Sequence, residues 1–218
     1  MKLSEQQRSQ LLANSIKEFA NNRLEEFRQY TQEIEAKFEA DKAGLAQRYY
    51  EAMASLSSEE ANMADDYFSE DYYTIEETFI GQYRKSTLVS LYSFLEHSMN
   101  SLCKHLKWKN QYTYALDDLA GNGIVRARSF LEKSAGADFT ALNTEWSKLQ
   151  TLNKVRNCIV HCEGDVNASA HKSLAELVKN TQGLSLRSEY FIVVERTYIN
   201  ECITTLKVFL EGLYKQVL

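Results

Sequence analysis

Apolar residues recur at helical spacing along most of the chain. From Glu5 to about Leu56 their separations are mostly three, four and seven, which describes one face of a long amphipathic helix. Unbroken, such a helix would measure roughly 80 Å at 1.5 Å per residue, longer than a small domain needs. We therefore expect either a bend near Asp41–Gly44 or a projecting arm that packs on a second helix or on a partner. The segment SLSSEE, Ser55–Glu60, supplies a capping signal and an acidic first turn for that second helix.

The rest of the chain predicts further helices and one extended segment. The pattern is irregular over Asp65–Phe79, where we place the boundary between an N-terminal helical arm, 1–74, and a second domain, 75–218. The second domain is predicted to contain a long helix at 73–107 with Ile75, Phe79, Leu88, Leu91, Leu95, Leu102 and Leu106 inward, a turn at 121–123, helices at 124–133, 140–162, 171–180 and 195–217, and an extended segment at 183–194. The predicted fold class is all-α, a helical bundle with a long N-terminal extension.

Composition agrees with long helices and divides the charge unevenly. The 218 residues include no proline and only eight glycines, the two residues that break or loosen helices. Residues 1–80 hold 8 Lys/Arg against 17 Asp/Glu, a balance of −9, and residues 81–218 hold 17 against 13, a balance of +4; together they give −5. A contact with an anionic partner therefore belongs to the second part of the chain. A general nucleic-acid-coating protein would be far more basic.

The expected environment is the cytoplasm. The longest apolar runs are a few residues, against roughly 20 for a bilayer span, and the start MKLSEQQRSQ lacks the pattern of a secretory signal. We expect no membrane contact. The four cysteines, Cys103, Cys158, Cys162 and Cys202, are expected to be reduced thiols.

The stretch KVRNCIVHCEG, residues 154–164, carries three polar side chains on a helix that otherwise looks buried. At about 100° per residue, with Arg156 at zero, Asn157 falls at roughly 100° and His161 at roughly 140°. Asn157 and His161 are thus neighbours, whereas Arg156 diverges from His161 by more than a right angle. The side expected to be buried holds Leu152, Val155, Cys158, Ile159 and Cys162. The polar side holds Gln150, Asn153 and Lys154, interrupted by Trp146 and Val160, and this mixture indicates a wet contact surface.

This stretch carries a family resemblance. Arg156-Asn157, three residues and then His161, near the end of a helix in an all-α chain, resemble the arginine–four-to-six–histidine signature of the HEPN superfamily. The earlier long helix carries LYSFLEHSMNSLCK, where HEPN domains often have a polar or acidic residue facing the signature. A loop, a short helix, an extended segment and a final amphipathic helix follow, as in the family. The resemblance covers about Ile75 to Leu218.

The resemblance implies an activity and a role for each signature residue. Many HEPN domains are metal-independent ribonucleases of toxin–antitoxin and anti-phage systems, and they dimerise so that two signatures face one RNA-binding cleft. On this chain His161 would be the general acid/base and Arg156 would hold the scissile phosphate, with Asn157 orienting His161 or donating to the phosphate. The RNA 2′-OH would be the nucleophile, no cofactor would take part, and an antitoxin or another defence protein would bind the arm. A two-fold axis would bring Arg156 of one copy to His161 of the other.

Three further sets of residues have two interpretations each. Glu96 either pairs with Arg156 or steers His161, or it is a plain surface glutamate. Lys104 and Lys107, near Trp108, Tyr112 and Tyr114, would bind RNA together with Lys154, or they complement a helix dipole. The run Gly121–Arg128, GNGIVRAR, would hold an anion at a helix start or is simply a turn, since it lacks the lysine and spacing of a P-loop.

The run Cys158 to Cys162, CIVHC, suggests zinc, but both cysteines lie on the apolar side and His161 points away from them. We therefore predict core thiols and no metal site. Two function hypotheses follow from the sequence. The first is a homodimeric HEPN-type endoribonuclease, and the second is a catalytically silent helical module that binds a protein, RNA or a nucleotide.

Overall fold

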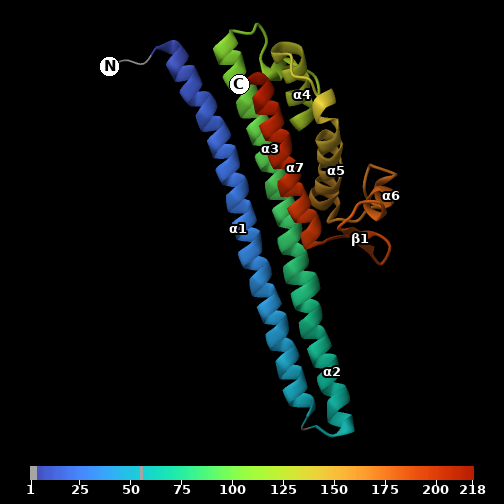
Figure 1. Ribbon diagram of the computed structural model, residues 1–218. Coiled ribbons are helices and arrows are strands. Elements are labelled where there is room, and N and C mark those ends of the chain that lie inside the picture. Colours follow the sequence, from blue (N-terminus) through green and yellow to red (C-terminus); the bar gives the residue numbers. More distant parts are fainter. Residues whose placement is uncertain (1–3, 55) are drawn as a thin grey trace.

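The computed structural model describes residues 4–54 and 56–218, and the chain is mostly helical. Two long helical segments run antiparallel as a hairpin, and the other helices and one small sheet pack against one end of it (Figure 1). The predicted all-α class is confirmed in outline. A single two-stranded sheet is the extended structure in the described part of the chain. Among the described helices, none combines the length and the apolar character that crossing a bilayer requires.

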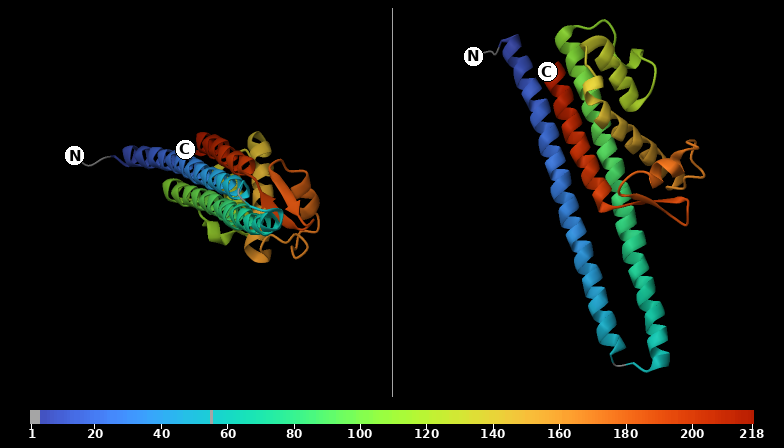
Figure 2. Two further views of the ribbon diagram at one scale, coloured as in Figure 1. Left: turned by 90° about the horizontal axis from the view of Figure 1, so that it is seen from below. Right: turned by 45° about the vertical axis from the view of Figure 1, so that its right-hand side comes forward.

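Helix α1 (Glu5–Met53) contains 49 residues and runs through Asp41–Gly44 without a break. Of the two alternatives predicted for this segment, the structure has the arm packed on a second helix rather than the bend. The first half of α1 lies along α7 (Arg196–Val217) and buries Ala20, Leu24 and Phe27 in the main core. Only the second half extends beyond the body of the molecule (Figure 2).

Helix α2 (Ser58–Tyr73) begins at the predicted capping signal. The backbone N–H and the hydroxyl of Ser57 both donate to the Glu60 carboxylate, at 3.0 and 2.6 Å. These hydrogen bonds cap the first turn of α2, where the chain has just reversed direction at the end of the hairpin. Ser55, the first residue of that signal, and the N-terminal residues 1–3 lie outside the described residues.

A π-helical segment, Thr74–Ile80, joins α2 to α3 (Gly81–Asn110) without interrupting the helical path. A π-turn closes i→i+5 bonds and so contains one residue more than an α-turn, which rotates the following side chains around the axis. Phe79, which the α-helical spacing predicted to be inward, is 55% exposed, and its neighbour Ile80 is buried instead. The prediction for Phe79 was wrong because it assumed an uninterrupted 3.6-residue period.

The remaining elements surround α3 and α7, which lie side by side along the body (Figures 1 and 2). They are two 3₁₀ turns, Leu116–Asp118 and Thr140–Leu142, and α4 (Gly123–Ala135), α5 (Asn143–Cys162), α6 (Leu174–Lys179), β1 (Leu184–Arg187) and β2 (Phe191–Val194). The strands pair antiparallel from Leu184↔Val194 to Arg187↔Phe191. The predicted helices are therefore confirmed within a few residues. The apolar residues predicted to face inward from the last helix are all buried: Ile199, Cys202, Ile203, Leu206, Phe209, Leu210 and Leu213.

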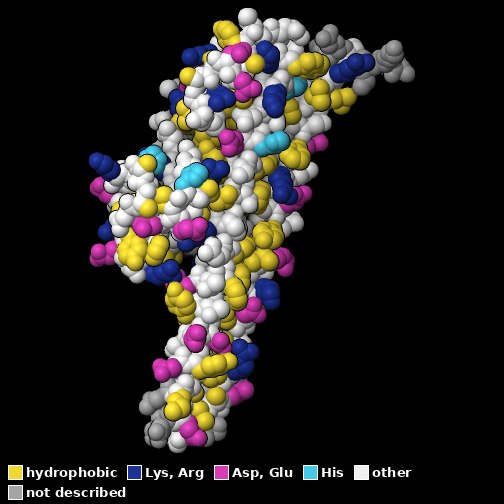
Figure 3. Space-filling model, turned by 180° about the vertical axis from the view of Figure 1, so that it is seen from behind, with side chains coloured by type: hydrophobic (Ala, Val, Ile, Leu, Met, Phe, Trp, Pro, Cys, Tyr) yellow, Lys and Arg dark blue, Asp and Glu magenta, His cyan; other side chains and the backbone are white. Residues whose placement is uncertain are grey.

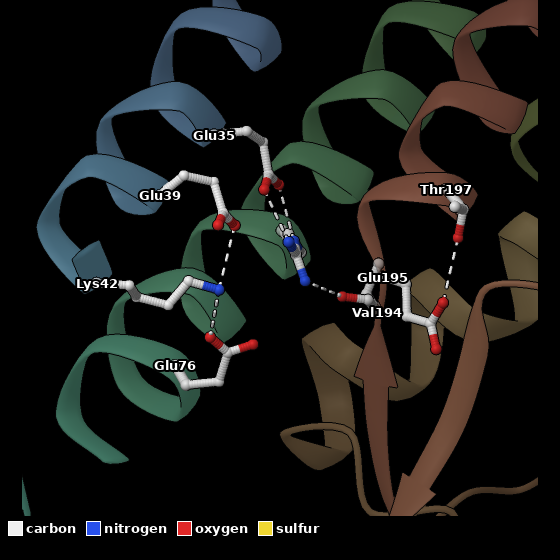
Figure 4. A network of polar contacts seen from close by, with 8 residues as sticks. Glu35, Glu39, Lys42, Glu76, Val194, Glu195 and Thr197 are labelled. Carbon is white, nitrogen blue, oxygen red and sulfur yellow. Dashed lines mark hydrogen bonds and ion pairs between the residues drawn. The ribbon is translucent and has the colours of Figure 1, made fainter. Parts of the chain in front are cut away.

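A buried ion pair fixes the hairpin to the body at the point where the arm leaves it. The Arg84 guanidinium on α3 donates to both carboxylate oxygens of Glu35 on α1, at 2.8 and 2.7 Å. The two side chains are only 14% and 2% exposed. A third Arg84 nitrogen donates to the Val194 carbonyl at 3.5 Å, which ties in the end of β2. Lys42 bridges Glu39 and Glu76 beside this pair, so two helices and the sheet meet in one polar network (Figure 4).

Breaking this pair on one side is predicted to be costly. Arg84→Met leaves the Glu35 carboxylate buried without its counter-ion, and we expect the free energy of unfolding to fall by about 3–5 kcal/mol. The double substitution Glu35→Met/Arg84→Met removes both charges and should recover most of that loss. Urea unfolding followed by circular dichroism measures both.

The matched control is Lys37→Met, which breaks the exposed pair between Lys37 and Asp41 on the same helix. It should change the free energy of unfolding by less than about 1 kcal/mol. If Arg84→Met were as mild as this control, the ion pair would not be what holds the arm.

Candidate functional site

The C-terminal half of α5 positions the three signature residues. The helix ends because Glu163 and Gly164 adopt left-handed backbone conformations, with φ of 54° and 87°. The Gly164 N–H donates back to the Cys158 carbonyl at 3.1 Å, which closes the last turn in the manner of a Schellman motif. Arg156 and Asn157 are half-buried, and His161 is exposed in this last turn.

The buried stripe of α5 does not stay on one side of the helix. Its buried members, Trp146, Leu149, Leu152, Val155 and Cys158, follow one another at intervals of three. Three residues turn the helix by about 300°, so the stripe moves back by about 60° at each step. Trp146, predicted on the polar side, is therefore buried, at 3% exposure, against Phe139 and Phe209. On the polar side, Gln150, Val160 and His161 are exposed, whereas Asn153, Lys154 and Asn157 are half-buried.

Arg156 is held by contacts that leave its charge uncompensated. Its guanidinium carbon lies 4.9 Å from the ring centroid of Tyr92 on α3. Its Nη1 donates to Asn157 Oδ1 at 2.9 Å, and Asn157 donates in turn to Asn153 Oδ1 at 3.2 Å. Its Nε is buried and has no hydrogen-bond partner. Within the described chain Arg156 makes no ion pair, with Glu96 or with any other carboxylate. A partly desolvated guanidinium of this kind can accept an anion.

Tyr92, a residue not predicted from the sequence to belong to the site, links Arg156 to the start of α4. Its hydroxyl accepts a hydrogen bond from the backbone N–H of Ile124, and burial, with a smaller contribution from Glu96, raises the pKa of this phenol. A Cβ placed on Gly123 would lie 3.3 Å from the Tyr92 hydroxyl and 3.0 Å from Glu96 Oε1, so both side chains lie against that glycine. Glu96 therefore sits at the N-terminus of α4, where the helix dipole favours a carboxylate. The spacing of Tyr92 and Glu96, one turn apart on α3, was a signal that could have flagged Tyr92.

His161 projects from the surface with no fixed partner. Within the described residues no hydrogen bond or ion pair holds its ring, and none joins it to Asn157, the residue predicted to orient it. The neighbouring Val160 is 43% exposed. The structure thus brings Arg156 and Asn157 together and leaves His161 free to meet another surface.

The predicted RNA-binding lysines do not gather at one place. Lys154 is half-buried on α5, next to the signature in sequence. Lys104 lies 12 residues beyond Tyr92 on α3, roughly 18 Å along the helix axis. Lys107, close to Lys104, donates to the Tyr112 carbonyl at 3.4 Å near the end of α3. Lys104 and Lys107 line a separate pocket of about 240 Å³ with Asp117.

The two other candidate sites have structural explanations. The Cys158 thiol is buried and donates to the Asp165 carbonyl, and its burial raises its pKa to about 11. Among the described residues no group of histidine, cysteine and acidic side chains is arranged to hold a metal ion. In the run GNGIVRAR, Arg126 pairs with Asp117, and Arg128 pairs with Glu132. Both arginines already have counter-ions, which favours the turn.

The signature residues lie outside the three best-formed pockets of the described chain. A pocket of about 390 Å³ opens between α5 and α7 and is lined in part by Lys148, Tyr198 and Glu201. Two further pockets, of about 240 and 210 Å³, lie elsewhere in the described part of the chain, and Arg156, Asn157 and His161 line none of these three. Figure 3 shows histidine side chains on the broad body of the molecule, together with lysines and arginines. In one copy of the chain, these three pockets therefore lie away from the signature, which has the exposed His161 and Val160 at its C-terminal end.

The unpaired charge of Arg156 predicts an anion site. At matched ionic strength, 20 mM phosphate in place of chloride should stabilise the fold by about 1 kcal/mol if phosphate binds with a millimolar dissociation constant. That corresponds to a rise of about 2–4 °C in melting temperature, which differential scanning fluorimetry resolves. Arg156→Gln should lose the rise, and Arg196→Gln, a change at an exposed arginine on α7, should keep it. Equal rises in both variants would place the anion elsewhere.

Three comparisons with known proteins complete the description of the site. No protein-family model, no curated protein and no solved structure matches the chain. The chemistry of Arg156, Asn157 and His161 is therefore inferred from their surroundings and from the resemblance of their spacing.

Proposed function

We propose that this protein is a metal-independent endoribonuclease of HEPN type that acts as a toxin or anti-phage effector. The observation that carries the proposal is the environment of Arg156. This guanidinium is half-buried over the Tyr92 ring, has a free buried Nε and lacks a carboxylate partner in the described chain. An exposed imidazole, His161, lies five residues further along the same helix. A cation for the phosphate and a group for proton transfer are the minimum for cleaving RNA without a metal.

The proposed chemistry uses the RNA's own 2′-hydroxyl. The imidazole of His161 takes the proton as O2′ attacks the phosphorus, a bond forms between them, and the bond from phosphorus to O5′ breaks. The departing O5′ takes a proton from solvent water, and His161 returns the proton it gained to solvent. Arg156 stabilises the charge that develops on the non-bridging oxygens, and Asn157, already bonded to Arg156, holds its guanidinium in place. The products are a 2′,3′-cyclic phosphate and a 5′-hydroxyl.

A homodimer is part of the proposal because the signature residues of one copy diverge around their helix. Arg156 and His161 diverge by about 140° around α5, and neither lines any of the three pockets described above. Two α5 ends facing each other across a two-fold axis would put Arg156 of one chain near His161 of the other and would cover the exposed Val160. RNA would bind in the cleft between the two copies, with the cytoplasm as its setting. An antitoxin or another defence protein is the proposed partner of the arm.

The second candidate is a catalytically silent helical module. The observation that favours it is the internal chain of hydrogen bonds from Arg156 to Asn157 to Asn153, which gives these side chains a structural role without any substrate. In that case the face around Val160 would bind a second copy, another protein, RNA or a nucleotide. The two candidates differ in whether RNA is cut.

Cleavage is predicted to depend on the signature. Purified wild-type protein should cut single-stranded RNA in the presence of EDTA, and expression in a bacterial host should stop growth and degrade total RNA. Because proton transfer and phosphate stabilisation are each worth about 10²–10⁴-fold in rate, His161→Ala and Arg156→Ala should lower cleavage by that factor. Asn157→Ala should lower it less. Gel analysis of a labelled oligonucleotide, with end-group chemistry on the products, measures the rates and the cyclic phosphate.

The controls are His171→Ala and Arg196→Ala, which remove an exposed histidine and an exposed arginine outside the signature. Both should cleave at the wild-type rate. An RNA with 2′-deoxyribose at the cut site should resist cleavage. Intact RNA with wild-type protein under every condition, including co-expression with neighbouring genes, would leave the silent module as the better hypothesis.

Mixing variants tests whether the site is shared between copies. If Arg156 of one chain works with His161 of the other, an equimolar mixture of Arg156→Ala and His161→Ala forms hybrid dimers in half of all cases. Each hybrid has one intact and one doubly defective site, so the mixture should regain about a quarter of the wild-type activity. A mixture as inactive as its two components would place both residues in one chain's site.

A further inference from the structure

The far end of the hairpin carries large apolar side chains that are more than half exposed in the described structure. We call residues 49–54 and 56–73 the acidic tip. Tyr50, Met63 and Tyr67 are 69%, 71% and 64% exposed, and Tyr72 and Tyr73 are 52% and 56% exposed. The two helices meet through other rings, since Tyr49 contacts Phe68 edge-on with centroids 5.4 Å apart. The exposed side chains are therefore surplus to the packing of the hairpin, and a group of this kind marks an interaction site.

The charge of the tip has one sign, and its described carboxylates have no counter-ion among the residues that the structure describes. Residues 49–73 contain seven Asp/Glu and no Lys/Arg. The described carboxylates there meet neutral donors only: Glu51 accepts from Gln47, Asp65 from the Tyr49 hydroxyl and Glu60 from Ser57. None of them makes an ion pair within the described residues.

The base of the arm differs from the tip. There Glu35 pairs with Arg84, Glu76 with Lys42, and Glu77 with Arg187. Carboxylates are thus neutralised where the arm joins the body and left unpaired where it projects. Figure 3 shows the result, since the lowest part of the narrow arm carries mainly acidic and hydrophobic side chains.

The unpaired carboxylates and exposed apolar side chains of the acidic tip argue against most classes of binding partner, chiefly because of electrostatic repulsion. RNA, DNA and an anionic membrane surface would be repelled, and a second copy would bring another acidic tip against the first. A metal ion finds no cluster of ligands among the described residues. A cationic protein segment is attracted by the carboxylates, buries the exposed aromatics under its apolar side chains, and can place Lys or Arg over a tyrosine face.

We propose that the acidic tip docks a basic amphipathic segment of a partner protein, rich in lysine or arginine on one face and in aliphatic residues on the other. The proposal goes beyond the ribonuclease activity and gives the chemistry of the partner proposed for the arm. It concerns binding at the end of the molecule away from the signature. A binding test can therefore fail while RNA cleavage stands, and the reverse.

The experiment uses the full-length chain and a fluorescein-labelled 20-residue peptide of Lys, Arg, Leu and Ala patterned as an amphipathic helix. Fluorescence anisotropy at 50 and 300 mM NaCl should show saturable binding that weakens at least threefold at the higher salt. Met63→Ser/Tyr67→Ser removes apolar contact and should weaken binding at least tenfold. Asp66→Asn/Glu70→Gln removes two unpaired charges and should weaken binding at least threefold at low salt.

The matched control, Glu18→Gln/Glu211→Gln, removes two exposed carboxylates from the body side of the molecule and should bind as wild type does. Circular dichroism of each variant confirms that the helices form. Four results would overturn the proposal: no binding of the basic peptide, equal binding of a peptide with Glu in place of Lys and Arg, equal losses in the control, or undiminished binding by Met63→Ser/Tyr67→Ser. Binding of a labelled 20-nucleotide RNA that Asp66→Asn/Glu70→Gln abolishes, or self-association that Met63→Ser/Tyr67→Ser abolishes in sedimentation, would assign the tip to another occupant.

Discussion

The buried pair of Glu35 and Arg84 is the contact on which the arrangement of the molecule depends. A carboxylate that is 2% exposed is tolerated only when its charge is matched, and the Arg84 guanidinium matches it with two parallel bonds. Such a fork has one good geometry, so it fixes α1 against α3 both along and around the helix axes. Because Arg84 also reaches the Val194 carbonyl, the strand that leads into α7 is positioned by the same group. Between Glu35 and the far end of the hairpin, the described part of α1 buries a single apolar residue, Leu45.

Arg84 lies on α3 and Arg156 packs against α3, and their different surroundings give these two arginines different roles. Arg84 has both fork positions filled by a carboxylate and is a structural residue. Arg156 lies over the ring of Tyr92, eight residues beyond Arg84 on α3, with an amide oxygen as its hydrogen-bond acceptor. Replacing a carboxylate by a ring face and an amide leaves the net positive charge in place, and this charge is what an anionic ligand can use.

The sequence predicted most of the fold because period and capping are local properties. The helix order, the SLSSEE cap, the extended segment before the last helix and the apolar face of that helix can all be read from neighbours within a few residues. Phe79 and Trp146 were misplaced for one shared reason. Both predictions assumed a fixed period, whereas the π-helical segment shifts the phase before α3 and the buried stripe of α5 moves around its helix. Both effects depend on the helices that pack against these segments, so the local sequence pattern alone does not predict them.

The site was predictable in part. The spacing of Arg156, Asn157 and His161 is a sequence property, and their placement at the end of one helix followed from it. The contact of Tyr92 with Arg156 and that of Glu96 with Gly123 were not predictable, because they depend on how α3 crosses α4 and α5. The geometry of the proposed dimer depends on how two copies pack, which is not a local property of the sequence.

The length of the hairpin constrains how the two proposed binding events could influence each other. From the start of α2 to Tyr92 is 34 residues of nearly continuous helix, roughly 50 Å. The Debye length at physiological salt is about 8 Å, so the charge of the acidic tip is screened many times over before it reaches Arg156. A basic partner that neutralises the tip therefore cannot change RNA binding at Arg156 through long-range electrostatics. It can act by covering the body with the rest of its own chain, or by moving α1 against α3 at the one buried contact, Glu35 with Arg84, that holds the arm in register. A partner long enough to cover the body can affect RNA binding without disturbing the ion pair of Glu35 with Arg84. A short partner, confined to the tip, can affect RNA binding only by shifting α1 against α3 at that ion pair.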